Sequence, residues 1–222
     1  MTRVAGVDGC AVGWVAVVLV DGQFAEAHLA ARFADLVGDT AGVIGVDIPL
    51  GSCGCPRAAD VAARRLLGPR RASVFDPPPL DVLDAPDLAT ANRRARAQHG
   101  RGVSAQAWNL RAKMRDVEPH WHAEPSRIVE VHPELSFATL HGAPLRHPKR
   151  TWAGHAARVA LLAGVGIALP ADLGAPGAAG ADDVLDAAIV AWSAARVAAG
   201  DARCVPDPPE HDDTGRVVAI WR

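Results

Sequence analysis

Long apolar runs are missing from this chain of 222 residues, although 50% of its residues are hydrophobic. A membrane-spanning helix needs about 20 consecutive apolar residues, so we expect none here. The first residues, Met-Thr-Arg, also lack the charged region, the apolar stretch and the cleavage site of a secretory signal. We therefore expect a cytoplasmic protein that forms one domain with a sizeable core.

Cysteine is scarce, and the cysteines present do not form a CxxC pair. Only Cys53 and Cys55 lie close together, at a spacing that structural zinc sites rarely use. We interpret all the cysteines as small residues that are buried or half-buried. The four are Cys10, Cys53, Cys55 and Cys204.

A large net charge is also missing, because the formal charge is only −2. The chain as a whole therefore lacks the basic character of many nucleic-acid-binding proteins. The charge is unevenly placed, however, since Arg57–Arg115 contains 12 basic and 5 acidic residues and carries +7. Such a segment can hold a polyanion, or it can simply form solvated arginine-rich helices. On the first interpretation, Arg93, Arg94 and Arg96 contact the substrate.

The pattern of apolar residues predicts one layered α/β domain with a helical insertion over residues 57–118. Three antiparallel strands open the chain, joined by short glycine-containing turns, and further strands follow later. The predicted strands cover residues 4–7, 14–20, 23–30, 43–46, 127–131 and 216–221. The predicted helices cover residues 32–37, 57–67, 86–98, 104–117, 133–140, 151–162 and 183–199. No internal repeat is visible.

Two aspartates each come directly after a buried strand. Asp8 follows the apolar run 4–7, and Asp47 follows the run 43–46 and precedes a proline segment that ends the strand. If these strands are neighbours, the two carboxylates lie within reach of one metal ion. Each aspartate alone is also typical of an ordinary turn.

A third acidic element opens the last predicted helix. Asp183 and Asp186 are three residues apart and share one helix face, whereas Asp182 is expected to be the N-cap. The helix dipole also favours acids in the first turn, so helix capping alone can explain them. In combination with Asp8 and Asp47, however, they supply the carboxylate oxygens that Mg²⁺ and Mn²⁺ prefer. Without a cation, such a cluster would take up a proton.

The predicted strand 127–131 leads into further polar residues. Glu130 and His132 point the same way along an extended chain, and Glu134 begins the next helix. One of the two glutamates is a candidate metal ligand or water-orienting base, and the pattern does not separate them. His132 is expected either to cap structure or to contact a phosphate.

Several stretches of the sequence resemble the domain-of-unknown-function family 429 (DUF429), whose members are described as predicted nucleases with a ribonuclease H fold. They follow in order over nearly the whole chain: Gly6-Val-Asp-Gly-Cys10 with Gly13-Trp14, Asp47-Ile-Pro-Leu-Gly51, Ser73-Val-Phe75, Gln106 with Trp108, Glu130-Val-His-Pro-Glu-Leu-Ser-Phe137, Lys149, and Asp182-Asp-Val-Leu-Asp-Ala187 with Ala191-Trp192. The resemblance implies a ribonuclease H-like mixed sheet with an acid on the first strand, an acid on the fourth strand and an acid on the last helix.

The leading hypothesis is therefore metal-dependent hydrolysis of phosphodiester bonds in DNA or RNA. Two Mg²⁺ or Mn²⁺ ions about 4 Å apart would activate water and stabilise the leaving oxygen. Asp8, Asp47, Asp183 and Asp186 are the expected metal ligands and catalytic acids. Glu130 and Glu134 are further catalytic candidates. The expected substrate contacts are Arg93, Arg94, Arg96, His132 and Lys149.

Two other hypotheses stay open at this point. The opening Gly6-Val-Asp-Gly and its glycine hairpin also resemble the phosphate loop of the actin and sugar-kinase fold, although no second copy of the loop is evident. Alternatively, the protein keeps the fold but acts as a non-catalytic nucleic-acid-binding or scaffold protein, because a fold alone does not specify an activity.

Overall fold

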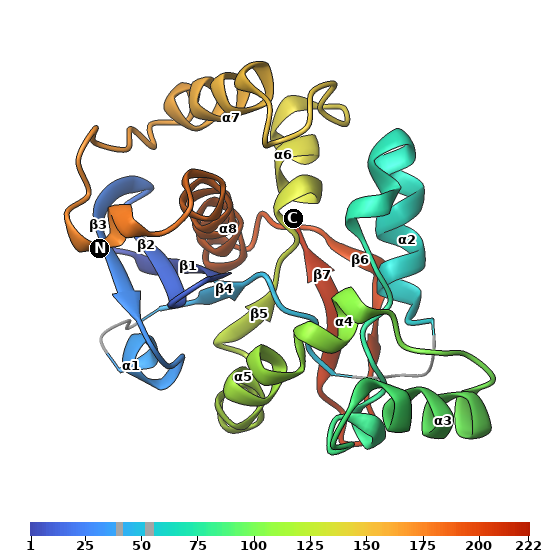
Figure 1. Ribbon diagram of the computed structural model, residues 1–222. Coiled ribbons are helices and arrows are strands. Elements are labelled where there is room, and N and C mark those ends of the chain that lie inside the picture. The colour runs from blue at the N-terminus through green and yellow to red at the C-terminus, as the bar shows by residue number, and fades with distance from the viewer. Residues whose placement is uncertain (39–41, 52–55) are drawn as a thin grey trace.

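The computed structural model describes residues 1–38, 42–51 and 56–222, and it is an α/β protein (Figure 1). The predicted α/β class is therefore confirmed, whereas Cys53 and Cys55 lie outside the described residues. None of the described helices is long and apolar enough to cross a membrane.

The main sheet has five strands in the order β3-β2-β1-β4-β5. Its antiparallel half consists of β1 (Arg3–Cys10), β2 (Gly13–Val20) and β3 (Gln23–Ala30), as the turn signals predict. The turn between β2 and β3 is Asp21-Gly22, where both residues have positive φ, as this dipeptide favours. The short strands β4 (Ile44–Val46) and β5 (Ile128–Glu130) then extend the sheet in parallel beyond β1.

A second sheet is a hairpin of β6 (Cys204–His211) and β7 (Val217–Trp221), which joins the main sheet through a bridge between Val131 and Trp221. The sequence predicts β7 but not β6, because β6 contains three prolines, which normally argue against a strand. The described residues contain no second copy of the β1-β2-β3 meander.

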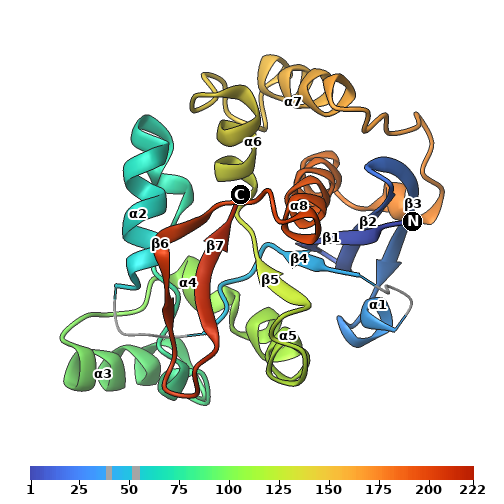
Figure 2. The ribbon, with the colours of Figure 1, turned by 180° about the vertical axis from the view of Figure 1, so that it is seen from behind.

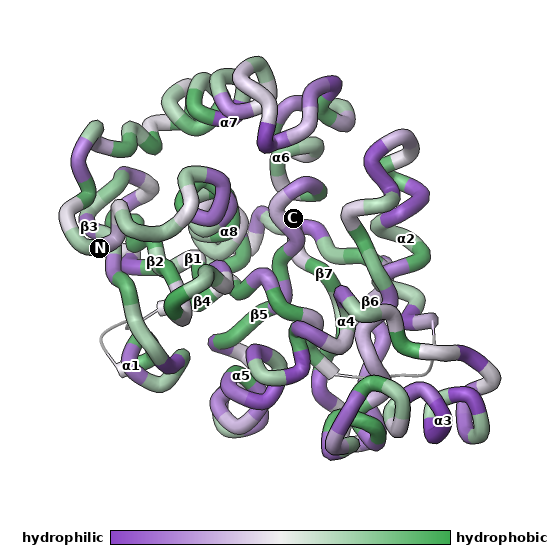
Figure 3. Tube along the Cα trace, in the orientation of Figure 1, coloured by the Kyte–Doolittle hydropathy of each residue, from purple (hydrophilic) through white to green (hydrophobic). Residues whose placement is uncertain are grey.

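Helices cover both faces of the main sheet (Figures 1 and 2). On one face, α1 (Ala34–Val37) and α5 (Arg111–Ala123) bury Phe33 and Trp121 against the strands. On the other face lies α8 (Ala181–Ala199), with α6 (Pro133–His141) and α7 (Trp152–Gly164) beyond it. Hydrophobic residues are prominent in β1, β2 and β4, and α8 carries both hydrophobic and hydrophilic residues (Figure 3).

Glycine allows α8 to pack directly onto β1. A Cβ atom at Gly6 would lie 2.0 Å from the backbone nitrogen of Ala191 and 2.2 Å from the carbonyl oxygen of Ala187. Gly45 on β4 meets Val190 of the same helix, with its Cβ position 2.8 Å from Cγ1. These two glycines therefore fix the height of α8 above the sheet.

The segment between β4 and β5 contains helices and no strand in its described part, as predicted. Its elements are α2 (Ala58–Leu67), η1 (Gly68–Ser73), η2 (Leu80–Val82), α3 (Leu88–His99), α4 (Ala105–Asn109) and α5. The single helix predicted over 104–117 is wrong, because the chain breaks at Leu110, which ends α4 and precedes α5. Helix α5 then continues through Pro119 to Ala123, five residues beyond the predicted end of the insertion.

Candidate functional site

Parallel pairing places Asp8 and Asp47 side by side. The backbone nitrogen of Asp47 donates to the carbonyl oxygen of Val7 at 3.0 Å, directly after Val7 pairs with Val46. Asp47 follows its strand as predicted, whereas Asp8 lies inside β1, which continues to Cys10 because it pairs with β2. Side chains alternate along a strand, so Asp8 shares the face of Gly6, which is the face covered by α8.

Helix α8 brings a further aspartate to this face. Asp186 directly precedes Ala187, which contacts Gly6, and the residue is only 3% exposed. Asp182 and Asp183 occupy the first turn of α8 and are partly exposed. The prediction that Asp182 is the N-cap is wrong, because α8 starts earlier, with extended Gly180 as its N-cap and Asp182 one residue inside the helix.

The aspartates perturb one another electrostatically. Burial raises the pKa of Asp8 well above its ordinary value, and the charges of Asp47 and Asp186 raise it further. Burial likewise raises the pKa of Asp47 to about 7 and that of Asp186 to about 7. Asp183 adds a smaller upward contribution to the pKa of Asp8. Three buried or half-buried carboxylates from two strands and one helix therefore share one region of negative potential.

A lysine partly neutralises this region. The Nζ atom of Lys149 lies 2.5 Å from Oδ2 of Asp186 and 3.4 Å from Oδ2 of Asp182. Burial opposes the charge of Lys149, but the charges of Asp186 and Asp8 raise its pKa. Lys149, a predicted phosphate contact, is therefore bound to an acid of the cluster.

The cluster matches a hard divalent cation in chemistry but not in arrangement. Its donors are carboxylate oxygens, the ligands of Mg²⁺ and Mn²⁺, and their pKa values are raised, chiefly by burial, despite the nearby charge of Lys149. Within residues 1–38, 42–51 and 56–222, no three His, Cys, Asp or Glu side chains are already arranged around a common metal position. Binding of a cation would therefore require side-chain rotation and displacement of the Lys149 ammonium group.

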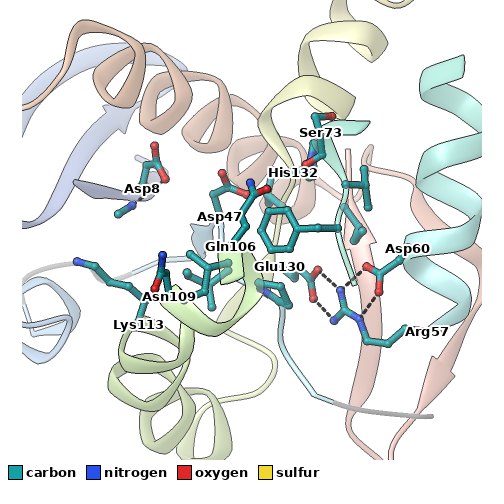
Figure 4. Close-up of a pocket in the computed structure, with 18 of the residues that line it drawn as sticks. Asp8, Asp47, Arg57, Asp60, Ser73, Gln106, Asn109, Lys113, Glu130 and His132 are labelled. Carbon is teal, nitrogen blue, oxygen red and sulfur yellow. Dashed lines mark hydrogen bonds and ion pairs between the residues drawn. The ribbon is translucent and has the colours of Figure 1, made fainter. Parts of the chain in front are cut away.

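The two glutamates are held by arginines. Glu130 accepts from Nη1 of Arg57 at 2.8 Å and from Nη2 at 2.7 Å, and the same guanidinium binds Asp60 (Figure 4). Glu134 pairs with Arg158 at 2.5 Å, and both of these residues are buried. The structure thus gives each glutamate a buried ion-pair partner.

His132 binds protein groups through both ring nitrogens. Its Nδ1 accepts from the backbone nitrogen of Leu135 and caps α6, and its Nε2 lies 3.2 Å from the carbonyl oxygen of Ser73. Burial lowers the pKa of His132, which favours the neutral ring. Of the two expected roles, capping is the one that the structure shows.

The predicted arginine contacts lie elsewhere. Arg93, Arg94 and Arg96 are exposed on α3, which is distant from α8 in both ribbon views (Figures 1 and 2). Arg93 donates to Thr90 on the same helix. The structure does not bring these arginines together with the aspartates.

A cavity of about 310 Å³ lies beside Asp8 and Asp47. Asp8 and the Arg57–Glu130 pair lie at opposite ends of it, with Asp47 between them (Figure 4). Residues that the site prediction missed line the wall formed by α4 and α5, namely Gln106, Asn109 and Lys113. Their spacing of three and then four residues is the helical signal that could have grouped them on one side.

The fold and the cavity define the class of the molecule as an α/β protein with acids gathered where its parallel strands end. The chain belongs to the family described as protein of unknown function (DUF429), whose model matches residues 6–211. No curated protein and no solved structure matches the chain. Five of the stretches that carry the family resemblance contribute to the cavity, through Asp8, Asp47, Phe75, Gln106 and His132.

Proposed function

We propose that this protein is a metal-dependent nuclease with a ribonuclease H-like fold that hydrolyses phosphodiester bonds. The sheet order β3-β2-β1-β4-β5 supports the fold, because a three-stranded antiparallel meander continues into parallel strands. Acids on β1, directly after β4 and on α8 match the placement that the family resemblance implies. The proposed cofactor is Mg²⁺ or Mn²⁺, and the proposed partner is DNA or RNA.

The observation that carries this proposal is the convergence of Asp8, Asp47 and Asp186, which come from three separate elements, on one largely buried region. Burial is the main cause that raises the pKa of each, and neighbouring carboxylates raise it further, so the fold holds these acids where their charged forms are disfavoured. A turn or a capped helix explains one such residue, but not three from separate elements. A divalent cation would compensate all three charges at once.

The residues have distinct roles in this proposal. When bound, the metal would supply activated water and stabilise the leaving oxygen. Asp8, which is central in the cluster, would hold the cation together with Asp47 and Asp186, and Asp183 would complete the shell from the first turn of α8. Lys149, released from Asp186, would be free to contact a phosphate oxygen of the substrate. Glu130 and Glu134 would instead hold the surrounding segments through their arginine partners.

Calorimetric titration with Mn²⁺ tests the proposal most directly. We expect the wild type to bind Mn²⁺ and Asp8→Asn to bind at least about 10-fold more weakly, since one ligand loses its charge. Asp213→Asn is the matched control, because Asp213 is exposed in the β6–β7 turn and lies away from the cluster. Cleavage of labelled single- and double-stranded DNA and RNA is measured in parallel, with Mg²⁺ and with Mn²⁺.

The outcomes separate the hypotheses. Cleavage that depends on added metal and is lost in Asp8→Asn, while Asp213→Asn keeps it, supports the nuclease. Absence of Mn²⁺ binding by folded wild type at millimolar concentration contradicts the metal site. Binding of nucleic acid without cleavage would instead indicate the scaffold role.

A further inference from the structure

We propose that the cavity receives a single unpaired nucleotide, with its phosphate toward Asp8 and Lys113 and its base against Phe75 and the amides of α4. This inference rests on the proposed function, because it assigns the form of nucleic acid that the nuclease would act on. It follows from the size of the cavity, the composition of its walls and the position of the basic residues.

The size of the cavity limits its occupant. A volume of about 310 Å³ is at the lower end of small-molecule sites, which span roughly 300–1,000 Å³. A double helix does not enter such a space. Its two backbones flank a minor groove that is itself about 6 Å wide, so the duplex is wider than the cavity. One base with its sugar is the part of a nucleic acid that fits.

The walls of the cavity suit a planar heterocycle. Apolar surface comes from Phe75 together with Pro49 and Leu110, and Phe75 is only partly buried. Aromatic rings provide stacking surfaces for unpaired bases in many single-strand binding proteins. The apolar part of the cavity thus offers contact with the face of a base.

Two amide side chains beside this surface are uncommitted. Gln106 and Asn109 are exposed and line the cavity from α4, and their side-chain amides form no hydrogen bond with any other residue that the structure describes. An amide presents both donors and an acceptor, so it can pair with the edge of a base. By contrast, the polar groups of Arg57, Asp60 and Glu130 satisfy one another and are not free for a ligand.

The lining carries four acids, and among its described residues only Lys113 is a basic side chain outside an ion pair, so it can meet at most one phosphate group. Lys113 is half-buried near Asp8, where it donates to the carbonyl oxygen of Gly13 and lies 4.1 Å from the ring centroid of Trp14. The only other cationic side chain in the described lining is Arg57, which is fully paired. The exposed arginines of α3 do not line the cavity.

Binding of mononucleotides tests the inference without requiring catalysis. The probes are AMP, GMP, CMP and UMP, with ribose 5-phosphate as the probe that lacks a base, each titrated calorimetrically with Mg²⁺ present. We expect at least one mononucleotide to bind about 10-fold or more tightly than ribose 5-phosphate, the effect of stacking and one or two base hydrogen bonds. Replacing both amides, Gln106→Ala with Asn109→Ala, should abolish most of this difference.

The control variant is Gln98→Ala, which removes an exposed amide from α3 outside the cavity. It should leave the preference for mononucleotides unchanged, and thermal unfolding should show that both variants are folded. Single-stranded oligonucleotides should compete with the bound mononucleotide, whereas blunt duplexes of equal length should not.

The results also separate this inference from the proposed nuclease activity. Equal binding of mononucleotides and ribose 5-phosphate, or competition by duplex as strong as by single strand, overturns the single-nucleotide site even if the protein cleaves duplexes. A base-dependent preference that the double amide variant loses sustains the site even if neither Mn²⁺ binding nor cleavage is detected.

Discussion

Replacing Arg57 with methionine leaves two buried carboxylates without their counter-charge. Arg57 is 2% exposed, Asp60 is 1% exposed and Glu130 is 6% exposed. The guanidinium donates to Asp60 at 2.6 and 3.0 Å, to Glu130 at 2.7 and 2.8 Å, and to the carbonyl oxygen of Leu50 at 3.1 Å. Removing one partner from a buried ion pair typically costs about 3–5 kcal/mol, so we expect Arg57→Met to lose about that much unfolding free energy at pH 7.

The deficit should depend on pH. Burial is the main cause that raises the pKa of Glu130, and Arg57 counteracts it, so Arg57→Met should raise the folded-state pKa further above the unfolded value. A carboxyl whose pKa is raised on folding makes the native state bind more protons, and stability then falls as pH rises through the folded pKa. The deficit of Arg57→Met should therefore be largest near pH 8 and shrink toward pH 5.

Urea denaturation at pH 5 and pH 8 provides the measurement. The triple variant Arg57→Met, Asp60→Leu, Glu130→Leu should recover most of the loss, since replacing a complete buried ion cluster by apolar residues is often neutral. Arg32→Met is the surface control, because the side chain of Arg32 is 72% exposed beside Asp35, and we expect a change of at most about 1 kcal/mol. A loss below about 1 kcal/mol for Arg57→Met, or a deficit that is the same at both pH values, would refute the reasoning.

Further predictions concern the cluster, the helix contact and the insertion. The folded-state pKa of Asp8 is raised, so Asp8→Asn should keep the metal-free protein at least as stable as wild type at pH 8 and weaken the fall in stability between pH 5 and pH 8; a large loss of thermal stability would mark Asp8 as a structural residue. Gly6→Ala should lower the unfolding free energy by about 3 kcal/mol or more in urea denaturation, whereas Gly164→Ala, which meets no atom within 4 Å, should be neutral or stabilising; equal effects would contradict the close contact. A triple alanine variant of the α3 arginines should flatten the salt dependence of oligonucleotide binding by up to about two or three units of slope and leave mononucleotide binding unchanged, and an unchanged slope would remove α3 from the substrate surface. The three arginines are Arg93, Arg94 and Arg96.

Local signals in the sequence predict much of the fold. Asp21-Gly22 predicts the turn between β2 and β3, because this dipeptide favours the positive φ values that the turn requires. Pro49, two residues after Asp47, predicts the end of β4, because proline has no backbone N–H to donate to a neighbouring strand. The sequence did not reveal β6, since its prolines oppose strand formation and only pairing with β7 outweighs them. The break at Leu110 is also set by tertiary packing, because no glycine or proline marks it and the side chain packs against the core.

The candidate site divides in the same way. The sequence predicts Asp8, Asp47 and Asp186 as site residues because the first two follow apolar strand-like runs and the third lies near the start of the last helix. The sequence does not predict the role of Glu130, because its partner Arg57 is 73 residues away and is expected from the sequence only as the first residue of a helix. Periodicity also places Gln106 and Asn109 on one side of α4, but it does not indicate that this side lines a cavity with Asp47.

The close contact of α8 with the sheet means that two glycines, Gly6 and Gly45, help to position the site although they have no side chains. Asp186 is attached to a helix whose distance from the sheet is set by the backbone of Gly6 and by Gly45. A methyl group at either position would lift that helix and move Asp186 relative to Asp8, while every acid remained in the sequence. A comparison of sequences that looks only at the aspartates would therefore class such a variant as intact, although the geometry on which any shared ligand depends would be gone.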